Sequence, residues 1–332
     1  MFKLKLRFFR CFKNKEIVFQ HFPLIIIGPN GSGKTSILEA IYFLATSKSF
    51  RTRIKNNLIS FRSNQAYICL DLDHKKLEII FYKTKPTIYR INGKKIGREK
   101  FINQFLISVF WWGDFRMIYG TPQDRRRFLN LLCLQQDSKY LQWLIIYKKM
   151  LKERNFALRK NDLNLIKIWD KKLSFVGNQI YLTRKKVIAN INKKISFFLS
   201  FFRPGKGKIV YYHNYLNQND FLKKLSHSLE KDILLGSTSV GPHRDDLKFF
   251  WGNKSLNSFS QGEIKAFLLS LKLSFFEKDK KINKFFLIDD GLTGLDKTAA
   301  KNFISLIQKQ KIPLILTSQN LPLRFEGQVI RL

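Results

Sequence analysis

The alternation of apolar and polar positions predicts strands at both ends of the chain and helices in its middle. Apolar residues from Phe2 to Phe8 alternate with lysine and arginine, which is typical of a half-buried strand. Further short strands are expected at 16–20, 67–73, 77–82 and 87–91, and Asn92-Gly93 is a strong hairpin signal. These strands predict an antiparallel β subdomain.

Four continuous apolar runs predict buried strands of a second sheet. They cover residues 24–27, 105–112, 285–288 and 314–316, and polar residues follow the last two. Strands that are covered on both faces are a feature of parallel sheets. We therefore expect an α/β fold with a parallel core sheet.

Between Thr121 and about Leu235 glycine is scarce and the apolar spacing is helical. Thr121-Pro122-Gln123-Asp124 is a typical helix start. Apolar residues at intervals of three and four run through 140–158 and 166–191, with a polar turn at Asn161-Asp162, and predict an antiparallel helical hairpin. A strand at 206–212 and a helix at 221–234 follow.

These patterns divide the chain into three parts. We expect the first half of a nucleotide-binding head at 1–118, an inserted helical lobe at 119–235, and the second half of the head at 236–332, where glycine becomes frequent again.

The strand at 24–27 leads into a glycine-rich loop with the pattern G-x-x-x-x-G-K-[ST]. Its residues are Gly28, Pro29, Asn30, Gly31, Ser32, Gly33, Lys34 and Thr35. Glycines let backbone N–H groups surround phosphate oxygens, and the following helix start adds positive potential. We expect Lys34 to reach the β- and γ-phosphates of ATP, and Thr35 to bind Mg²⁺.

The strand at 285–288 ends in two carboxylates, Asp289 and Asp290, which is the Walker B pattern. The first acid is expected to bind Mg²⁺ and the second to orient the attacking water. With Lys34 they form the expected catalytic set. Ser260 and Glu263 also match an S-x-x-E capping box. After the two nucleotide motifs, however, Ser260 and Gly262 match the signature turn of head-type ATPases, which faces the ATP of a second subunit.

Charge adds an expected partner to this picture. The 332 residues contain 61 Lys+Arg and 24 Asp+Glu, a formal net charge of +37. Such an excess favours nucleic acid first and an acidic membrane surface second, although compositional bias explains part of it. Arg125-Arg126-Arg127 at a helix start, and Lys148, Lys149, Lys152, Arg154, Arg184, Lys185 and Lys186 on the hairpin, either face an anion or are solvated.

Other features exclude several classes of protein. We expect no transmembrane helix and no signal peptide, because no long apolar run occurs and charge interrupts the N-terminus. Cys11, Cys69 and Cys133 are scattered, so we expect neither a disulfide framework nor a metal cluster, as fits a reducing cytosol.

Several runs together resemble the RecF family, whose members are ATPases related to the SMC and Rad50 heads. The runs are Phe9-Arg10-Cys11-Phe12, Gly28–Thr35 with Leu38-Glu39-Ala40-Ile41-Tyr42, Arg125-Arg126-Arg127-Phe128-Leu129, Gly241-Pro242-His243-Arg244-Asp245-Asp246-Leu247, Ser260-Gln261-Gly262 and Leu287-Ile288-Asp289-Asp290. The chain departs from the family pattern at Trp111-Trp112-Gly113-Asp114, Glu263 and Gly294.

The resemblance implies a cytoplasmic protein of DNA replication and repair with an ABC/SMC-type head. It implies ATP and Mg²⁺ as cofactors, an ATP-dependent homodimer, slow hydrolysis that DNA stimulates, and work with RecO and RecR in loading recombinase. The expected DNA partners are single-stranded and duplex DNA at gaps or junctions. Two alternatives remain open at this stage, an ABC transporter-type ATPase subunit and a DNA-binding scaffold that does not hydrolyse ATP.

Overall fold

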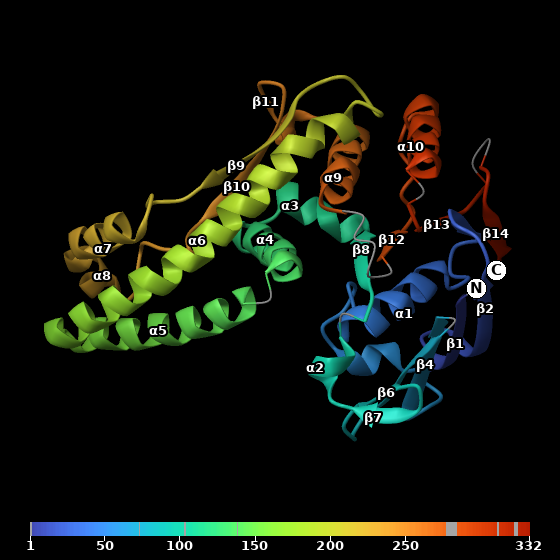
Figure 1. Cartoon of the computed structure of the whole chain (residues 1–332), viewed down its shortest axis with the longest axis horizontal. Coiled ribbons are helices and arrows are strands. Elements are labelled where there is room, and N and C mark those ends of the chain that lie inside the picture. Colours follow the sequence, from blue (N-terminus) through green and yellow to red (C-terminus); the bar gives the residue numbers. More distant parts are fainter. Residues whose placement is uncertain are drawn as a thin grey trace. The chain divides into compact units, whose positions relative to one another are not determined.

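The computed structural model describes residues 2–72, 74–102, 104–137, 139–276, 284–310, 312–321 and 325–332. It divides into two compact units (Figure 1). The first unit comprises Met1–Asp114, Phe201–Arg203 and Gln261–Leu332, and the second comprises Phe115–Ser200 and Pro204–Ser260. Within the described residues, no helix is both long and apolar enough to cross a membrane.

The first unit contains a five-stranded parallel sheet with the order β14-β3-β13-β12-β8. Its strands are β3 (Leu24–Ile27), β8 (Leu106–Phe110), β12 (Lys284–Ile288), β13 (Leu314–Ser318) and β14 (Gln328–Arg331). All four residues of β3 are buried, because both faces of the sheet are covered. The helices of this unit are α1 (Lys34–Thr46), α2 (Arg98–Phe101), α9 (Gln261–Phe275) and α10 (Lys297–Lys309).

An antiparallel six-stranded sheet completes the first unit, with the order β2-β1-β4-β5-β6-β7. Its strands are β1 (Phe2–Phe9), β2 (Phe12–Phe19), β4 (Gln65–Leu72), β5 (Lys75–Tyr82), β6 (Ile88–Ile91) and β7 (Lys94–Ile96). Asn92 and Gly93 both have positive φ, 49° and 78°, as a tight hairpin turn requires. Helix α1 contacts both sheets, so the main apolar core lies between them. The two predicted sheets are confirmed.

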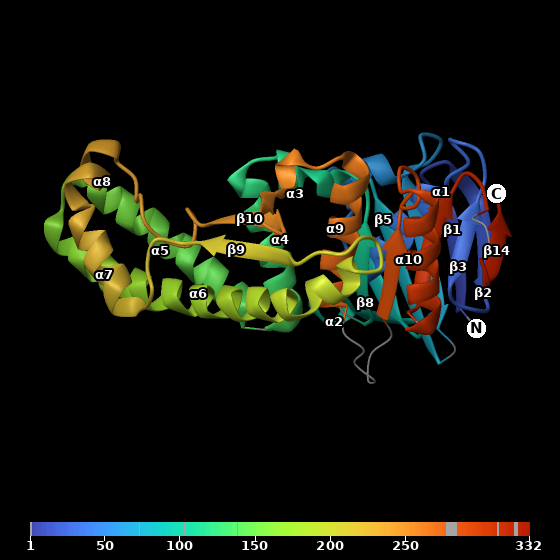
Figure 2. The ribbon, with the colours of Figure 1, turned by 90° about the horizontal axis from the view of Figure 1, so that it is seen from above.

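The second unit is mainly helical. It contains α3 (Arg116–Tyr119), α4 (Pro122–Gln136), α5 (Tyr140–Lys160), α6 (Leu163–Leu199), α7 (Gln218–His227) and α8 (Leu229–Leu235). Helices α5 and α6 lie side by side (Figures 1 and 2), which confirms the predicted hairpin. The chain reverses at Asn161, whose φ is 53°, and the Asp162 side chain accepts a hydrogen bond from Leu165 N at the start of α6.

A small antiparallel sheet, with the order β11-β10-β9, lies in the second unit. Its strands are β9 (Gly207–Tyr212), β10 (Asp246–Trp251) and β11 (Lys254–Ser255). Because β10 pairs with β9, residues 236–260 group with the helical unit, whereas the sequence placed them in the head. The single helix expected at 221–234 is broken at Ser228 into α7 and α8.

The remaining elements are short 3₁₀ turns, and one of them corrects a predicted strand end. They are η1 (Lys55–Leu58), η2 (Trp112–Phe115) and η3 (Leu256–Ser258). Strand β8 stops at Phe110 and not at Trp112, because Trp111 N donates to Asp114 Oδ2 at 2.9 Å and turns the chain.

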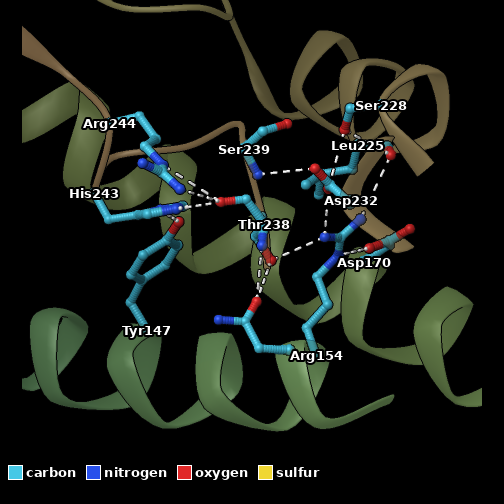
Figure 3. A network of polar contacts seen from close by, with 11 residues as sticks. Tyr147, Arg154, Asp170, Leu225, Ser228, Asp232, Thr238, Ser239, His243 and Arg244 are labelled. Carbon is cyan, nitrogen blue, oxygen red and sulfur yellow. Dashed lines mark hydrogen bonds and ion pairs between the residues drawn. The ribbon is translucent and has the colours of Figure 1, made fainter. Parts of the chain in front are cut away.

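A buried ionic network fixes the hairpin of the second unit (Figure 3). The Arg154 side chain of α5 is 0% exposed, and its Nε donates to Asp170 Oδ1 at 2.5 Å. Its Nη1 donates to Asp232 Oδ2 at 2.7 Å and to Thr238 Oγ1 at 2.9 Å. Arg154 therefore joins α5 to α6, α8 and the chain after α8. The sequence left open whether Arg154 faces an anion or is solvated, and the anions that it faces are carboxylates of the same unit.

Arg184 of α6 is also buried, at 2% exposure, so of the two alternatives that the sequence left open a solvated side chain is wrong for it. Its Nη1 donates to Asp245 Oδ2 and to Pro242 O, both at 2.7 Å. Asp246, the residue after Asp245, accepts hydrogen bonds from Nε and Nη2 of Arg125 at 2.6 and 3.0 Å. The anion that the sequence left open for Arg125 is thus a carboxylate of the same unit.

His243 lies in the same network (Figure 3). Thr238 O can only accept, so the bond of 3.0 Å places the proton on His243 Nε2, and Nδ1 accepts from Tyr147 OH at 2.9 Å. Burial, with repulsion from Arg244 and Arg126, lowers the pKa of His243 to about 4. The imidazole is therefore neutral and locked in one tautomer at neutral pH.

Candidate nucleotide-binding site

The predicted phosphate loop connects β3 to α1 in the first unit. Gly31 and Gly33 have φ of +84° and +98°, a backbone region that favours glycine. A Cβ on Gly33 would lie 2.4 Å from the Phe12 ring, so this position also needs the absence of a side chain. No side chain among the described residues caps α1, and its first turn carries no acid. Its N-terminal N–H groups are thus suited to an anion.

Lys34 spans the loop. Its Nζ donates to Gly28 O and to Pro29 O, both at 2.8 Å. Ser32 Oγ is buried and has no hydrogen-bond partner within the described residues. Buried hydroxyls normally find a partner, so an anion bound in this loop would satisfy the unmet donor. The residues present therefore fit a nucleotide phosphate group.

The phosphate loop and the acidic strand meet at one hydrogen bond. Thr35 Oγ1 donates to Asp289 Oδ1 at 2.8 Å, across 254 residues of sequence. Thr317, at the end of β13, donates from its Oγ1 to the same Asp289 oxygen at 2.9 Å. These contacts arise because the carboxyl ends of the parallel strands β3, β12 and β13 lie at one edge of the sheet.

Burial raises the pKa of Asp289, while hydrogen bonds from Thr35 and Thr317 and the charge of Arg51 oppose the shift. A buried carboxylate of this kind is stabilised by a cation. Within the described residues no group of three His, Cys, Asp or Glu could hold a metal alone. Thr35 and Asp289 supply two oxygen atoms, which suits Mg²⁺ because this ion takes its other ligands from phosphate and water.

Asp290 has a strained backbone, with φ of 52°. Its N–H donates to Thr317 Oγ1 at 2.9 Å, and its Oδ1 accepts from Thr293 Oγ1 at 2.7 Å. Lys265 Nζ of α9 donates to Asp290 O at 3.3 Å and also to Thr293 O. The backbone of Asp290 is thus held by β13 and α9, and its carboxylate is held by Thr293 of the loop after β12.

A second polar cluster surrounds Glu39 of α1. Glu39 is 0% exposed and accepts from Arg10 Nε and Nη2 at 2.8 and 2.7 Å. Ser49 Oγ also donates to Glu39, and Arg51 Nη1 lies 3.8 Å from its Oε2. This cluster fixes the basic loop that follows α1, so the positive charge of Arg51 acts on Asp289.

Ser260 and Gly262 lie at the start of α9. The hydrogen bonds of Lys34, Thr35 and Asp289 given above involve neither of them. A Cβ on Gly262 would lie 2.5 Å from Gly294 O, so the turn instead packs closely on the loop after β12. The structure therefore brings together Lys34, Thr35, Asp289 and Asp290, and Gly262 packs on the loop that follows Asp290.

Sequence reasoning assigned no role to Thr317, Lys265 or Gln319. The only signal for Thr317 is its place at the polar end of a buried strand. Gln319 Nε2 donates to Asn30 Oδ1 at 3.1 Å, which ties the phosphate loop to the chain after β13. These three residues support the predicted ones.

Comparison with known proteins identifies the family. The family model described as RecF/RecN/SMC N terminal domain matches residues 1–323. The DNA replication and repair protein RecF of Acholeplasma laidlawii is 34% identical over 326 residues, covering 95% of this chain and 92% of the relative. The protein of the same name from Leptospira interrogans is 33% identical over 320 residues, covering 92% and 87%.

Solved structures agree. The chain is similar to the recombination mediator protein RecF-ATP of the RecFOR pathway, with a TM-score of 0.83, 26% identity, and coverage of 99% and 94%. An Smc head domain from Pyrococcus furiosus, at 18% identity and a TM-score of 0.55 over 96% and 90%, shares the fold. The expected ABC/SMC-type head is confirmed. The chain belongs to the RecF/RecN/SMC N-terminal domain family and, within it, to the RecF proteins.

Proposed function

We propose that the chain is an ATP-dependent DNA-binding protein of replication and repair. The observation that carries the proposal is the bond between Thr35 Oγ1 and Asp289 Oδ1, which joins the phosphate loop to the acidic strand. The names of the relatives support the setting in DNA replication and repair, and the solved RecF-ATP structure supports the nucleotide.

The residues have distinct roles in this proposal. Lys34 and the loop from Gly28 to Gly33 would hold the phosphates of ATP, and Thr35 and Asp289 would hold Mg²⁺. The metal ion would supply charge stabilisation at the phosphate group. Asp290 would orient the attacking water, since Thr293, Thr317 and Lys265 fix its position.

The proposal extends to a homodimer. Ser260 and Gly262 of one copy would close on ATP held by the other, so that only ATP completes the dimer. The dimer would clamp DNA at gaps or junctions, and slow hydrolysis would release it. RecO and RecR are the proposed protein partners, which the RecFOR pathway of the solved relative supports. The cytoplasm remains the predicted place of action.

The test compares Lys34→Arg and Ser260→Arg with Lys48→Arg, an exposed lysine after α1 that has no role in the site. Analytical ultracentrifugation with and without ATP should show dimers for the protein and for Lys48→Arg, and monomers for the other two variants. Dimers in both site variants would contradict the proposal.

A gel-shift panel of gapped, duplex and single-stranded DNA, with and without ATP, tests the DNA side. Affinity should fall with salt with a logarithmic slope of about −0.9 per phosphate contacted, because counterions are released. A flat salt response would remove phosphate contact from the proposal. Tight ATP binding with no phosphate release, even with DNA present, would favour the non-hydrolysing scaffold.

A further inference from the structure

The outer side of α5 exposes three large apolar residues in one stripe. Leu141, Ile145 and Phe156 are 50%, 61% and 50% exposed. They follow the spacing i, i+4, i+15, which brings them to one face of a helix. Half-exposed apolar side chains gathered in this way, and not scattered singly, mark an interaction surface.

Four cations share this stripe with the apolar residues. A groove of about 580 Å³ runs along α5, and its cationic lining residues are Lys148, Lys149, Lys152 and Arg159. Its other lining residues are Ile145, Leu151 and Asn155, so no carboxylate of the described residues lines it. The aliphatic parts of the lysine side chains form apolar sides of the groove, and their ammonium groups lie at its edge.

The scaffold under this face is rigid. Figure 3 shows Tyr147 and Arg154 pointing from α5 into the buried network, away from the outer face. At the far end of the groove, Asn155 Oδ1 accepts from Thr238 N at 2.9 Å, and Arg159 Nη1 donates to Gly236 O at 3.4 Å. A face held in this way is pre-organised, which lowers the entropy cost of binding.

The mixture of the two kinds of side chain identifies the class of partner. A DNA backbone would pair with the lysines but would leave Leu141, Ile145 and Phe156 in water. A membrane would take up apolar side chains, but here cations lie among them and not along the flanks of an apolar face. An amphipathic protein helix with an apolar ridge and acidic flanks can cover the apolar side chains and pair with the cations at the same time.

We propose that the outer face of α5, defined by Leu141, Ile145, Lys148, Lys149, Lys152, Phe156 and Arg159, docks an acidic amphipathic helix of a partner protein. This surface goes beyond the proposed function, because none of its residues belongs to the nucleotide site. The partner helix contributes leucine-like side chains that cover Leu141, Ile145 and Phe156, and Asp or Glu that pair with the four cations.

The test uses a designed 21-residue helical peptide, matched to the 21 residues of α5, with leucine at heptad positions a and d and glutamate at e and g. Fluorescence anisotropy with the full chain is measured at peptide concentrations where the peptide is monomeric. A charge variant, Lys148→Gln/Lys149→Gln/Lys152→Gln, is matched to Lys171→Gln/Lys186→Gln/Lys193→Gln on exposed positions of α6. An apolar variant, Leu141→Ser/Ile145→Ser, is matched to Ile168→Ser/Leu182→Ser, whose side chains are also about half exposed.

The acidic peptide should bind the full chain, and the affinity for the peptide should be about tenfold lower in each α5 variant. The α6 variants should change its affinity by less than about twofold, and a lysine-for-glutamate peptide should not bind. ATP-dependent dimers and DNA affinity should persist in both α5 variants, which separates this proposal from the proposed function.

Three outcomes overturn the proposal. The first is equal weakening by the α6 variants, which means unspecific attraction to a basic protein. The second is no peptide binding together with a loss of DNA affinity in the α5 charge variant, which makes the face a nucleic-acid contact. The third is binding of anionic phosphatidylglycerol vesicles in place of the peptide, lost in the same variants, which assigns a membrane.

Discussion

Removal of the Arg154 guanidinium is the sharpest test of how the helical unit is held together. Arg154→Met keeps the length and apolar body of the side chain but leaves Asp170 and Asp232 without their shared cation. Both carboxylates are buried, at 6% and 0% exposure. The cost therefore arises from carboxylates that the variant leaves unpaired, more than from the lost contacts themselves.

Removing one partner of a buried ion pair costs about 3–5 kcal/mol, and Arg154 serves two carboxylates and the Thr238 hydroxyl, so we expect about 4 kcal/mol or more. For a unit of this size about 1 kcal/mol lowers the melting temperature by roughly 2–4 °C, so the melting temperature should fall by about 10 °C. Urea unfolding followed by circular dichroism measures the free energy directly.

A triple variant separates charge from packing. Arg154→Met/Asp170→Asn/Asp232→Asn has no buried charge at this point, so we expect it to regain much of the lost stability. Burial already raises the pKa of Asp170 against the opposing charge of Arg154, and without Arg154 burial and repulsion from Asp232 act unopposed. The difference in stability between the wild type and the single variant should therefore shrink as the pH falls from 7 to 5.

A loss below about 1 kcal/mol in Arg154→Met would refute the reasoning, because a buried guanidinium with two carboxylates cannot be so easily replaced. A triple variant no more stable than the single one would show that the shape of arginine matters and its charge does not.

Three further predictions concern the nucleotide site and the polar network. Gly33→Ala should weaken ATP binding by more than about tenfold in calorimetry, because its Cβ would meet the Phe12 ring. Gly31→Ala has open space for its Cβ, so the free energy of ATP binding should fall only by the cost of a left-handed residue, about 1 kcal/mol. Equal effects would contradict the packing argument. Asp290→Asn should lower phosphate release by about 100-fold at saturating ATP and keep the ATP-dependent dimer; an unchanged rate would remove its catalytic role. The folded pKa of His243, about 4, lies below its unfolded value near 6.5, so only the unfolded chain gains a proton as the pH falls between these values, and stability should fall by up to about 1.4 kcal/mol per pH unit; His243→Gln should flatten that slope, and an unchanged slope would assign it to other groups.

The parts of the site that were predictable from sequence are those with a local signal. The buried run at 24–27, the glycines after it and the lysine lie within about a dozen residues, so their pattern is visible before folding. Asp289 and Asp290 are visible because they end an apolar strand. Thr317 has no such pattern, because its role depends on the order in which β12, β13 and β3 are placed in the sheet.

In the helical unit, local sequence patterns did not predict which charged residues are buried. Arg154 and Arg184 look like the exposed lysines around them when only spacing is considered. Their burial depends on carboxylates far along the chain, 78 residues away for Asp232 and 61 for Asp245. The grouping of residues 236–260 with the helical unit could not be predicted for the same reason, since the pairing of β10 with β9 is not a local property.

The strand that carries the phosphate loop has a consequence for how the chain is made. Both neighbours of β3 are β13 and β14, which begin at Leu314 and Gln328. A ribosome therefore releases the loop long before any strand exists to pair with it, while the helical hairpin can form at once from adjacent residues. Premature termination before β13 would leave a folded helical hairpin together with an unpaired β3 whose loop cannot hold nucleotide, and such a fragment is a natural substrate for chaperones and proteases.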